Sequence, residues 1–76
     1  MKTKRNARFV MCINNEGNPA SLEVRKVYRL LPDPNARSLG LLRVVDESGE
    51  DYLYPSDQFV AIHLPASAQE SVLLNR

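Results

Sequence analysis

The side chains best suited to chemistry gather between residues 46 and 57, where carboxylates and tyrosines share a short stretch. The acids there are Asp46, Glu47, Glu50, Asp51 and Asp57. Several carboxylate oxygens are what Ca²⁺ and Mg²⁺ require. A tight hairpin, however, points alternate side chains apart, and the spacing matches no known metal-binding loop. The sequence therefore predicts no metal site, and solubility of a hairpin explains the acids better.

The tyrosines near these acids allow two interpretations. Tyr28, Tyr52 and Tyr54 with neighbouring carboxylates would form an aromatic, acidic surface that receives a cationic side chain. Alternatively, Tyr52 and Tyr54 fill a core that is short of large apolar residues, with their hydroxyls at its rim. The sequence leaves both interpretations open.

No catalytic constellation accompanies this cluster. His63 is the sole histidine and stands in an apolar segment, which is typical of a structural histidine. Cys12 lies beside Phe9 and Ile13, where a buried thiol behaves as a small hydrophobe. A nucleophile needs a base and an orienting group, and no motif supplies them. We therefore expect a protein that is not an enzyme and that carries no cofactor.

Basic residues support a second hypothesis. They crowd the first eight positions and recur around residue 27, and a basic arm with a basic patch suits phosphate contacts. A basic stripe interleaved with aromatic residues, as single-stranded nucleic acid favours, is missing. The alternative prediction is nucleic-acid binding through Lys2, Lys4, Arg5, Arg8, Arg25, Lys26 and Arg29.

Size and composition narrow the class of protein. A chain of 76 residues holds one domain, and such a domain buries only roughly 60% of its unfolded surface. A binding surface is easier to build on it than a buried catalytic cleft. The first residues lack the apolar run of a signal peptide, no segment has the length of a membrane span, and one cysteine excludes an internal disulfide. We expect a cytoplasmic protein.

The segments that must position these residues read mostly as strands. The first strand is predicted over Arg8 to Ile13, followed by a loop with dense turn signals. The second is predicted over Lys26 to Leu31, although residues 24, 27, 28 and 31 would also share one face of a helix. Its β-branched residues and the following Pro32 favour a strand. Asp33 as N-cap and Gly40 at the exit predict a helical turn near residues 34 to 39.

A hairpin and a third strand follow. Leu41 to Val45 and Asp51 to Tyr54 flank a turn at Ser48-Gly49. A two-residue loop would pair Val44 with Leu53, whereas a bulged turn with Gly49 in the left-handed region pairs Val44 with Tyr52. Ser is a poor left-handed residue, so the bulged register is favoured. Pro55-Ser56-Asp57 then leads into a strand over Phe59 to Leu64, and Pro65 to Arg76 predicts a short helix that either docks or frays.

Residues Tyr52 to Ile62, YLYPSDQFVAI, resemble the end of a Src-homology-3 (SH3) type barrel, in which a Pro-Ser 3₁₀ turn and an aromatic-Val pair open the last strand. The segments KVYRLLPD and GLLRVVDESGEDYLYP resemble a group of small, uncharacterised bacterial proteins with this barrel. The resemblance implies the fold and no activity. The chain has no Trp and no early Ala-Leu-Tyr-Asp-Tyr motif. It therefore departs from the domains that bind proline-rich peptides.

These observations predict a mainly β protein, a small five-stranded SH3-like barrel with a short C-terminal helix. Residues 1–8 form a flexible basic arm, 9–64 the barrel, and 65–76 a C-terminal helix or frayed tail. The leading functional hypothesis is a non-enzymatic interaction module that binds a protein or peptide, with the oligomeric state open. Its predicted binding residues are Tyr52, Tyr54, Pro55, Asp46, Glu50 and Asp51.

Overall fold

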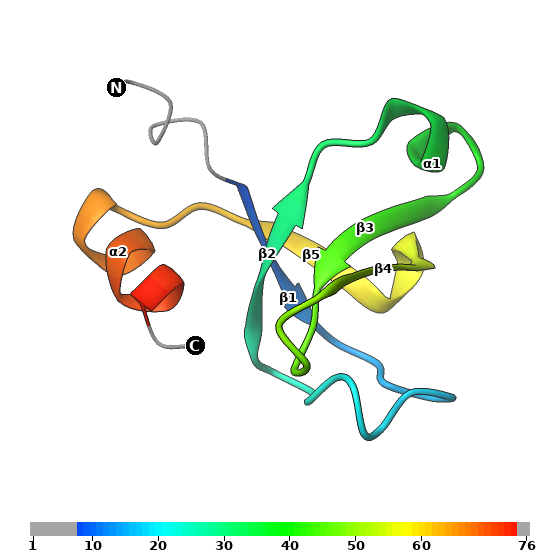
Figure 1. Cartoon of the computed structure of the whole chain (residues 1–76), viewed down its shortest axis with the longest axis horizontal. Coiled ribbons are helices and arrows are strands. Elements are labelled where there is room, and N and C mark those ends of the chain that lie inside the picture. The colour runs from blue at the N-terminus through cyan, green and yellow to red at the C-terminus, as the bar shows by residue number, and fades with distance from the viewer. Residues whose placement is uncertain (1–7, 75–76) are drawn as a thin grey trace.

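A computed structural model describes residues 8–74, which form one antiparallel sheet flanked by two short helices (Figure 1). The strands are β1 (Arg8–Cys12), β2 (Val27–Leu31), β3 (Leu41–Val45), β4 (Asp51–Pro55) and β5 (Phe59–Ile62). The helices are α1 (Pro34–Ser38) and α2 (Ala66–Leu74), and the 3₁₀ turn η2 (Ser56–Gln58) separates β4 from β5. The predicted strands and helices are confirmed, and the helical alternative for the second strand is wrong.

The prediction of a closed barrel is wrong. The strand order β4-β3-β2-β1-β5 leaves β4 and β5 as edges, and no ladder joins these two within residues 8–74. After η2 the chain lies directly against β1, so β5 uses its hydrogen bonds there. The rings of Tyr54 and Phe59 nevertheless meet edge to face, with centroids 6.1 Å apart. Side chains, rather than backbone pairing, bring the two edges together.

The hairpin of β3 and β4 has the predicted bulged register. Val44 lies opposite Tyr52, and Leu42 lies opposite Tyr54. Gly49 has a φ of +85°, a backbone conformation that is unfavourable for residues with a side chain and that glycine adopts freely. The poor left-handed propensity of Ser48 therefore decided the turn type, as the sequence predicted.

The core lies on one face of the sheet. Residues directly opposite in the ladders share a face, so Val10, Tyr28, Val44 and Tyr54 point to the same side, and all are buried. The long loop between β1 and β2 folds beneath this face and inserts Leu22, which is 1% exposed. A loop residue thus fills space that the open sheet leaves uncovered.

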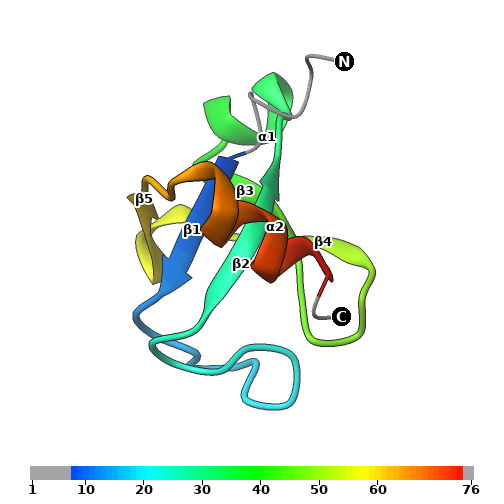
Figure 2. The same cartoon turned by 90° about the vertical axis from the view of Figure 1, so that its left-hand side faces the viewer.

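The helices lie at two separate places on the sheet. The carboxylate of Asp33 accepts the N–H of Ala36 at 3.0 Å, which caps α1 as predicted. Figure 2 shows α2 crossing in front of β1 and β2, and contacts with β2 hold it there. The helix therefore docks on the face of the sheet opposite the core. None of the described helices is long and apolar enough to cross a bilayer.

Candidate functional site

Strand β4 is the most exposed strand of the sheet. Only Tyr54 of its five residues is buried. Tyr52 is 50% exposed and Leu53 is 42% exposed, and they lie on opposite faces of the strand. On one side β4 pairs with β3, and on the other side no strand pairs with it within residues 8–74. An edge strand with two large exposed side chains is therefore available to a partner.

The direction of the backbone groups of β4 follows from the hydrogen bonds at its ends. The N–H of Asp46 donates to the carbonyl of Glu50 at 3.0 Å, and the N–H of Ser56 donates to the carbonyl of Gly40 at 2.9 Å. Hydrogen-bonded pairs alternate along an antiparallel ladder, so Tyr52 and Tyr54 direct their backbone groups toward β3. Asp51, Leu53 and Pro55 direct theirs outward, and Pro55 has no N–H to offer.

The predicted binding residues separate into a buried group and an exposed group. Tyr54 is 5% exposed and Asp46 is 2% exposed, so the interpretation of Tyr54 as a core residue is correct. Its hydroxyl donates to the Asp46 carboxylate at 2.5 Å. The backbone N–H and the hydroxyl of Ser48 donate to the same carboxylate at 2.9 and 2.6 Å. These two predicted residues are thus part of the fold.

Hydrogen bonds keep the Asp46 carboxylate ionised although it is buried. Burial alone raises the pKa of Asp46, but the hydrogen bonds from Ser48 and Tyr54 outweigh it and hold the pKa below its ordinary value. Burial, together with the Asp46 carboxylate, raises the pKa of Tyr54 to about 12. Asp46 is therefore ionised, and the Tyr54 hydroxyl keeps its proton and donates a hydrogen bond to Asp46.

A second tyrosine–carboxylate pair stands beside the first, and sequence reasoning missed it. The hydroxyl of Tyr28 donates to Glu47 at 2.5 Å and accepts the backbone N–H of Glu23 at 2.7 Å. Lys26 forms an ion pair with Glu47 at 2.8 Å, and its ammonium lies 5.8 Å from the centroid of the Tyr28 ring. Lys26 and then Tyr28 lower the pKa of Glu47. The pair holds the β1–β2 loop against the hairpin.

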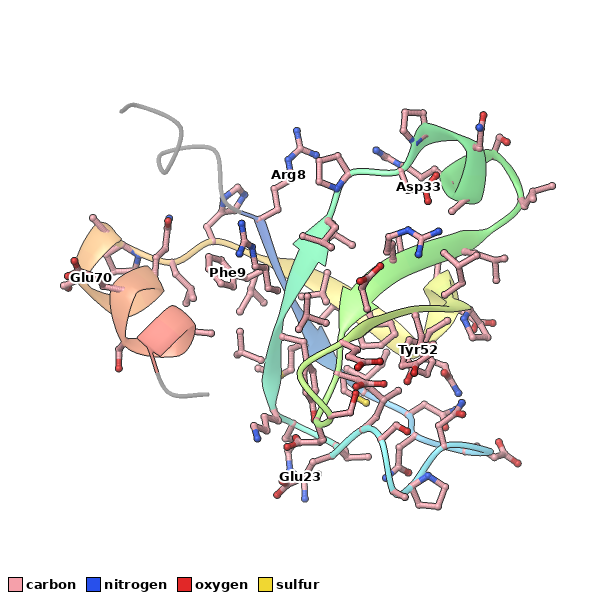
Figure 3. The ribbon with its side chains drawn as sticks, in the orientation of Figure 1. Arg8, Phe9, Glu23, Asp33, Tyr52 and Glu70 are labelled. Carbon is pink, nitrogen blue, oxygen red and sulfur yellow. The ribbon has the colours of Figure 1, made fainter. Side chains whose placement is uncertain are left out.

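The exposed group of predicted residues includes Glu50, which forms no ion pair among the described residues, and Asp51, which shares one arginine with another carboxylate. Asp51 pairs with Arg43 at 3.0 Å, and Arg43 also pairs with Asp33 at 2.8 Å. Tyr52 projects from β4 (Figure 3). Its hydroxyl donates to Glu50 at 3.1 Å, and this carboxylate raises the pKa of Tyr52. An aromatic surface for a cation is thus reduced to Tyr52 and Glu50. The acids that crowd the sequence are mostly used by the fold itself.

The predicted basic patch is dispersed. Arg8 lies opposite Leu30 in the ladder and Arg29 lies opposite Phe9, which places the two arginines on opposite faces. Lys26 is neutralised by Glu47. Arg25 stands in the loop with a φ of 71°. Lys2, Lys4 and Arg5 lie outside the described residues.

Arginines gather instead along an open groove that runs from α1 across the sheet to β5 and the start of α2. Arg8, Arg37 and Arg43 line it together with His63, among apolar side chains such as Leu30 and Leu42. Cys12 is fully buried, and His63 is exposed. No group of three His, Cys, Asp or Glu residues within residues 8–74 is placed to hold a metal ion.

Leu53 is the residue of the exposed edge that sequence reasoning left out. The favoured register already placed it on the face opposite Tyr52, which was sufficient to find it. The free edge itself could not be found, because the prediction closed the sheet into a barrel. Comparison of the chain with family models, curated proteins and solved structures produced no significant match.

The buried carboxylate of Asp46 and the exposed, ion-paired carboxylate of Glu47 predict a loss of stability in acid. The folded pKa of Asp46 and of Glu47 lies below the ordinary values of 3.8 and 4.5. Their contribution is fully present above the unfolded pKa and is lost as the pH falls through the folded pKa. We expect the urea midpoint to be flat between about pH 7 and 5 and to fall steeply below about pH 4.5. The Glu47→Gln variant should show a shallower fall, and an equal fall would contradict the assignment.

Proposed function

We propose that the chain is a non-enzymatic interaction module that binds a partner protein by adding an extended strand to β4. One observation carries the proposal: the outward N–H and C=O groups of Asp51 and Leu53 stand on a free edge beside the exposed side chain of Tyr52. Strand addition to such an edge is a common mode of peptide recognition. The hydrogen bonds of the backbone supply affinity, and side chains on the two faces supply selectivity.

The side chains of β4 suit this role. Tyr52 presents a ring on one face and Leu53 an aliphatic side chain on the other, so a strand laid alongside would cover both. Asp51 forms an ion pair with Arg43, which also pairs with Asp33, and this ion pair lowers the electrostatic barrier to an incoming strand. Pro55 ends the edge, because it lacks an N–H and η2 turns the chain away. The binding footprint is therefore short.

We also propose a fold family and a cellular location for the chain. We infer an SH3-like domain of a bacterial cytoplasm, with its barrel left open between β4 and β5. The resemblance of residues 52–62 to an SH3-type barrel end supports the fold, and the predicted order of turn and strand there is present. The single cysteine, fully buried and unpaired, is compatible with a reducing compartment.

The test uses a fluorescent peptide that alternates Thr and Val over six residues and ends in Lys. We expect wild-type protein to bind it and the Tyr52→Ala variant to bind about fivefold more weakly, since an aromatic contact contributes about 1 kcal/mol. Val60 on the other edge strand has the same exposure as Leu53, 42%. Val60→Ser is therefore the matched control for Leu53→Ser, and anisotropy is the measurement.

Two further probes distinguish strand addition from side-chain contact alone and from nucleic-acid binding. A peptide with N-methyl groups on all of its amides should not bind, because neither of its edges can donate to the outward carbonyls of β4. A labelled single-stranded oligonucleotide tests the nucleic-acid alternative, which requires salt-dependent binding that Arg8→Glu weakens. Peptide binding that Tyr52→Ala and Leu53→Ser leave unchanged would contradict the proposal.

A further inference from the structure

We propose that the strand added to β4 is β4 of a second copy of this chain, paired antiparallel about a two-fold axis at Tyr52. This inference rests on the proposed function and names its partner. Two-fold dimers are the commonest assemblies of soluble proteins, and in them one surface patch contacts its own copy. The question is whether the edge of β4 is complementary to itself.

The backbone of β4 favours one symmetric register. When Asp51 lies opposite Leu53 of the second copy, every outward N–H and C=O of both residues finds a partner. A register centred on Leu53 instead places Asp51 opposite Pro55, which has no N–H to donate. A register centred on Asp51 brings two carboxylates directly together. The first register is therefore the one that leaves no backbone group of Asp51 or Leu53 unpaired.

The side chains agree with that register. Tyr52 then faces its own copy across a pair without backbone hydrogen bonds, where side chains approach most closely. On the other face the two Leu53 side chains are diagonal neighbours, at roughly 7–8 Å between backbones, within reach of each other. Tyr52 and Leu53 are two of the large apolar residues that the monomer exposes. The same register covers both.

Charge does not oppose this pairing. Asp51 shares the positive charge of Arg43 with Asp33, at 3.0 and 2.8 Å, and it lies opposite the uncharged Leu53 of the second copy. Glu50 stands two residues from the axis, so the two copies of Glu50 are roughly 14 Å apart along paired strands. That distance exceeds the Debye length of about 8 Å at physiological ionic strength. An edge-to-edge contact of this size predicts a weak dimer rather than an obligate one.

Disulfide trapping in the full-length protein tests the register. Paired Cβ atoms at positions 52 lie close to the range that a disulfide spans, whereas diagonal positions 53 do not. We expect Tyr52→Cys to give a covalent dimer on a non-reducing gel under mild oxidation, and Leu53→Cys to give little. Wild-type protein, whose Cys12 is buried, is the background control. Circular dichroism confirms that both variants fold.

Sedimentation equilibrium over 10 to 500 μM (a range of about 2 kcal/mol in association free energy) provides the second measurement. The wild type should shift toward a dimer, Leu53→Ser should shift the curve to higher concentration, and Val60→Ser should not. A wild type that stays monomeric overturns the inference, and so does trapping at position 53 in place of 52. If such a monomer still binds the Thr-Val peptide through Tyr52, only the second copy as partner is excluded and strand addition at β4 stands.

Discussion

Replacing Asp46 with asparagine is expected to lower the free energy of unfolding by about 2 to 3 kcal/mol, the range of hydrogen bonds to a buried charged group. Asp46 is 2% exposed, and its carboxylate accepts hydrogen bonds from the hydroxyls of Tyr54 at 2.5 Å and Ser48 at 2.6 Å. An amide keeps one acceptor oxygen and replaces the other with a donor. That donor would face the hydroxyl of Tyr54, which would then accept a hydrogen bond instead of donating one, and the buried hydroxyl proton would lose its charged acceptor.

A double-mutant cycle with Tyr54→Phe measures how much of this loss belongs to the pair. The phenylalanine retains the ring that meets Phe59 and removes only the hydroxyl. We expect a coupling energy of about 1 to 2 kcal/mol between positions 46 and 54, as for groups in one hydrogen-bond network. Urea denaturation of the single and double variants at pH 7 gives the four free energies.

Glu50→Gln is the control for the Asp46 substitution. Glu50 is an exposed acid in the same hairpin, and its described partner is the Tyr52 hydroxyl at 3.1 Å. Its replacement should change the free energy of unfolding by less than about 0.5 kcal/mol. Equal losses for Asp46→Asn and Glu50→Gln would contradict a special role for the buried carboxylate.

The hairpin shows what local sequence rules predict well. Ser48 and Gly49 selected the turn, the turn set the register, and the register placed Tyr52 and Leu53 on opposite faces. Each step depends on backbone preferences of residues close together in the chain. The cap of α1 by Asp33 is of the same kind. Local rules of this kind require no knowledge of the rest of the fold.

The candidate site was predicted less well, because burial depends on distant segments. The sequence places Asp46 and Glu47 in one acidic cluster, yet Asp46 meets Tyr54 inside the core and Glu47 meets Tyr28. Tyr52 and Tyr54 share a face in the correct register, but only the second reaches Phe59. No pattern along one strand distinguishes them. The prediction of a closed sheet was wrong for the same reason, since closure depends on how β5 pairs with β1 and not on the turn before β5.

The substitution Leu22→Ala, in the long loop between β1 and β2, is expected to destabilise the domain strongly. Leu22 is 1% exposed and packs in the core beneath the sheet, although it belongs to no strand or helix. Its backbone N–H donates to Asn18 at 3.0 Å, and its carbonyl accepts the side-chain amide of Asn15 at 3.0 Å. These bonds fix the conformation of the loop itself, and the N–H of Glu47 donates to the carbonyl of Ser21 at 3.0 Å, which ties the loop to the hairpin. The loop therefore cannot collapse easily into a cavity left by the missing side chain.

Truncating Leu22 should consequently cost about 3 kcal/mol or more, the usual loss for a buried leucine whose surroundings relax little. A domain of this size has only about 5 to 10 kcal/mol in total, so the variant should melt well below the wild type in a calorimeter. Leu39→Ala provides the control, because Leu39 is 74% exposed and should lose less than about 0.5 kcal/mol. A small effect at Leu22 would mean that the loop does not close the core. The core face of the sheet would then have to be covered by another segment. A second chain that pairs with β4 would in that case join a domain whose core is incomplete.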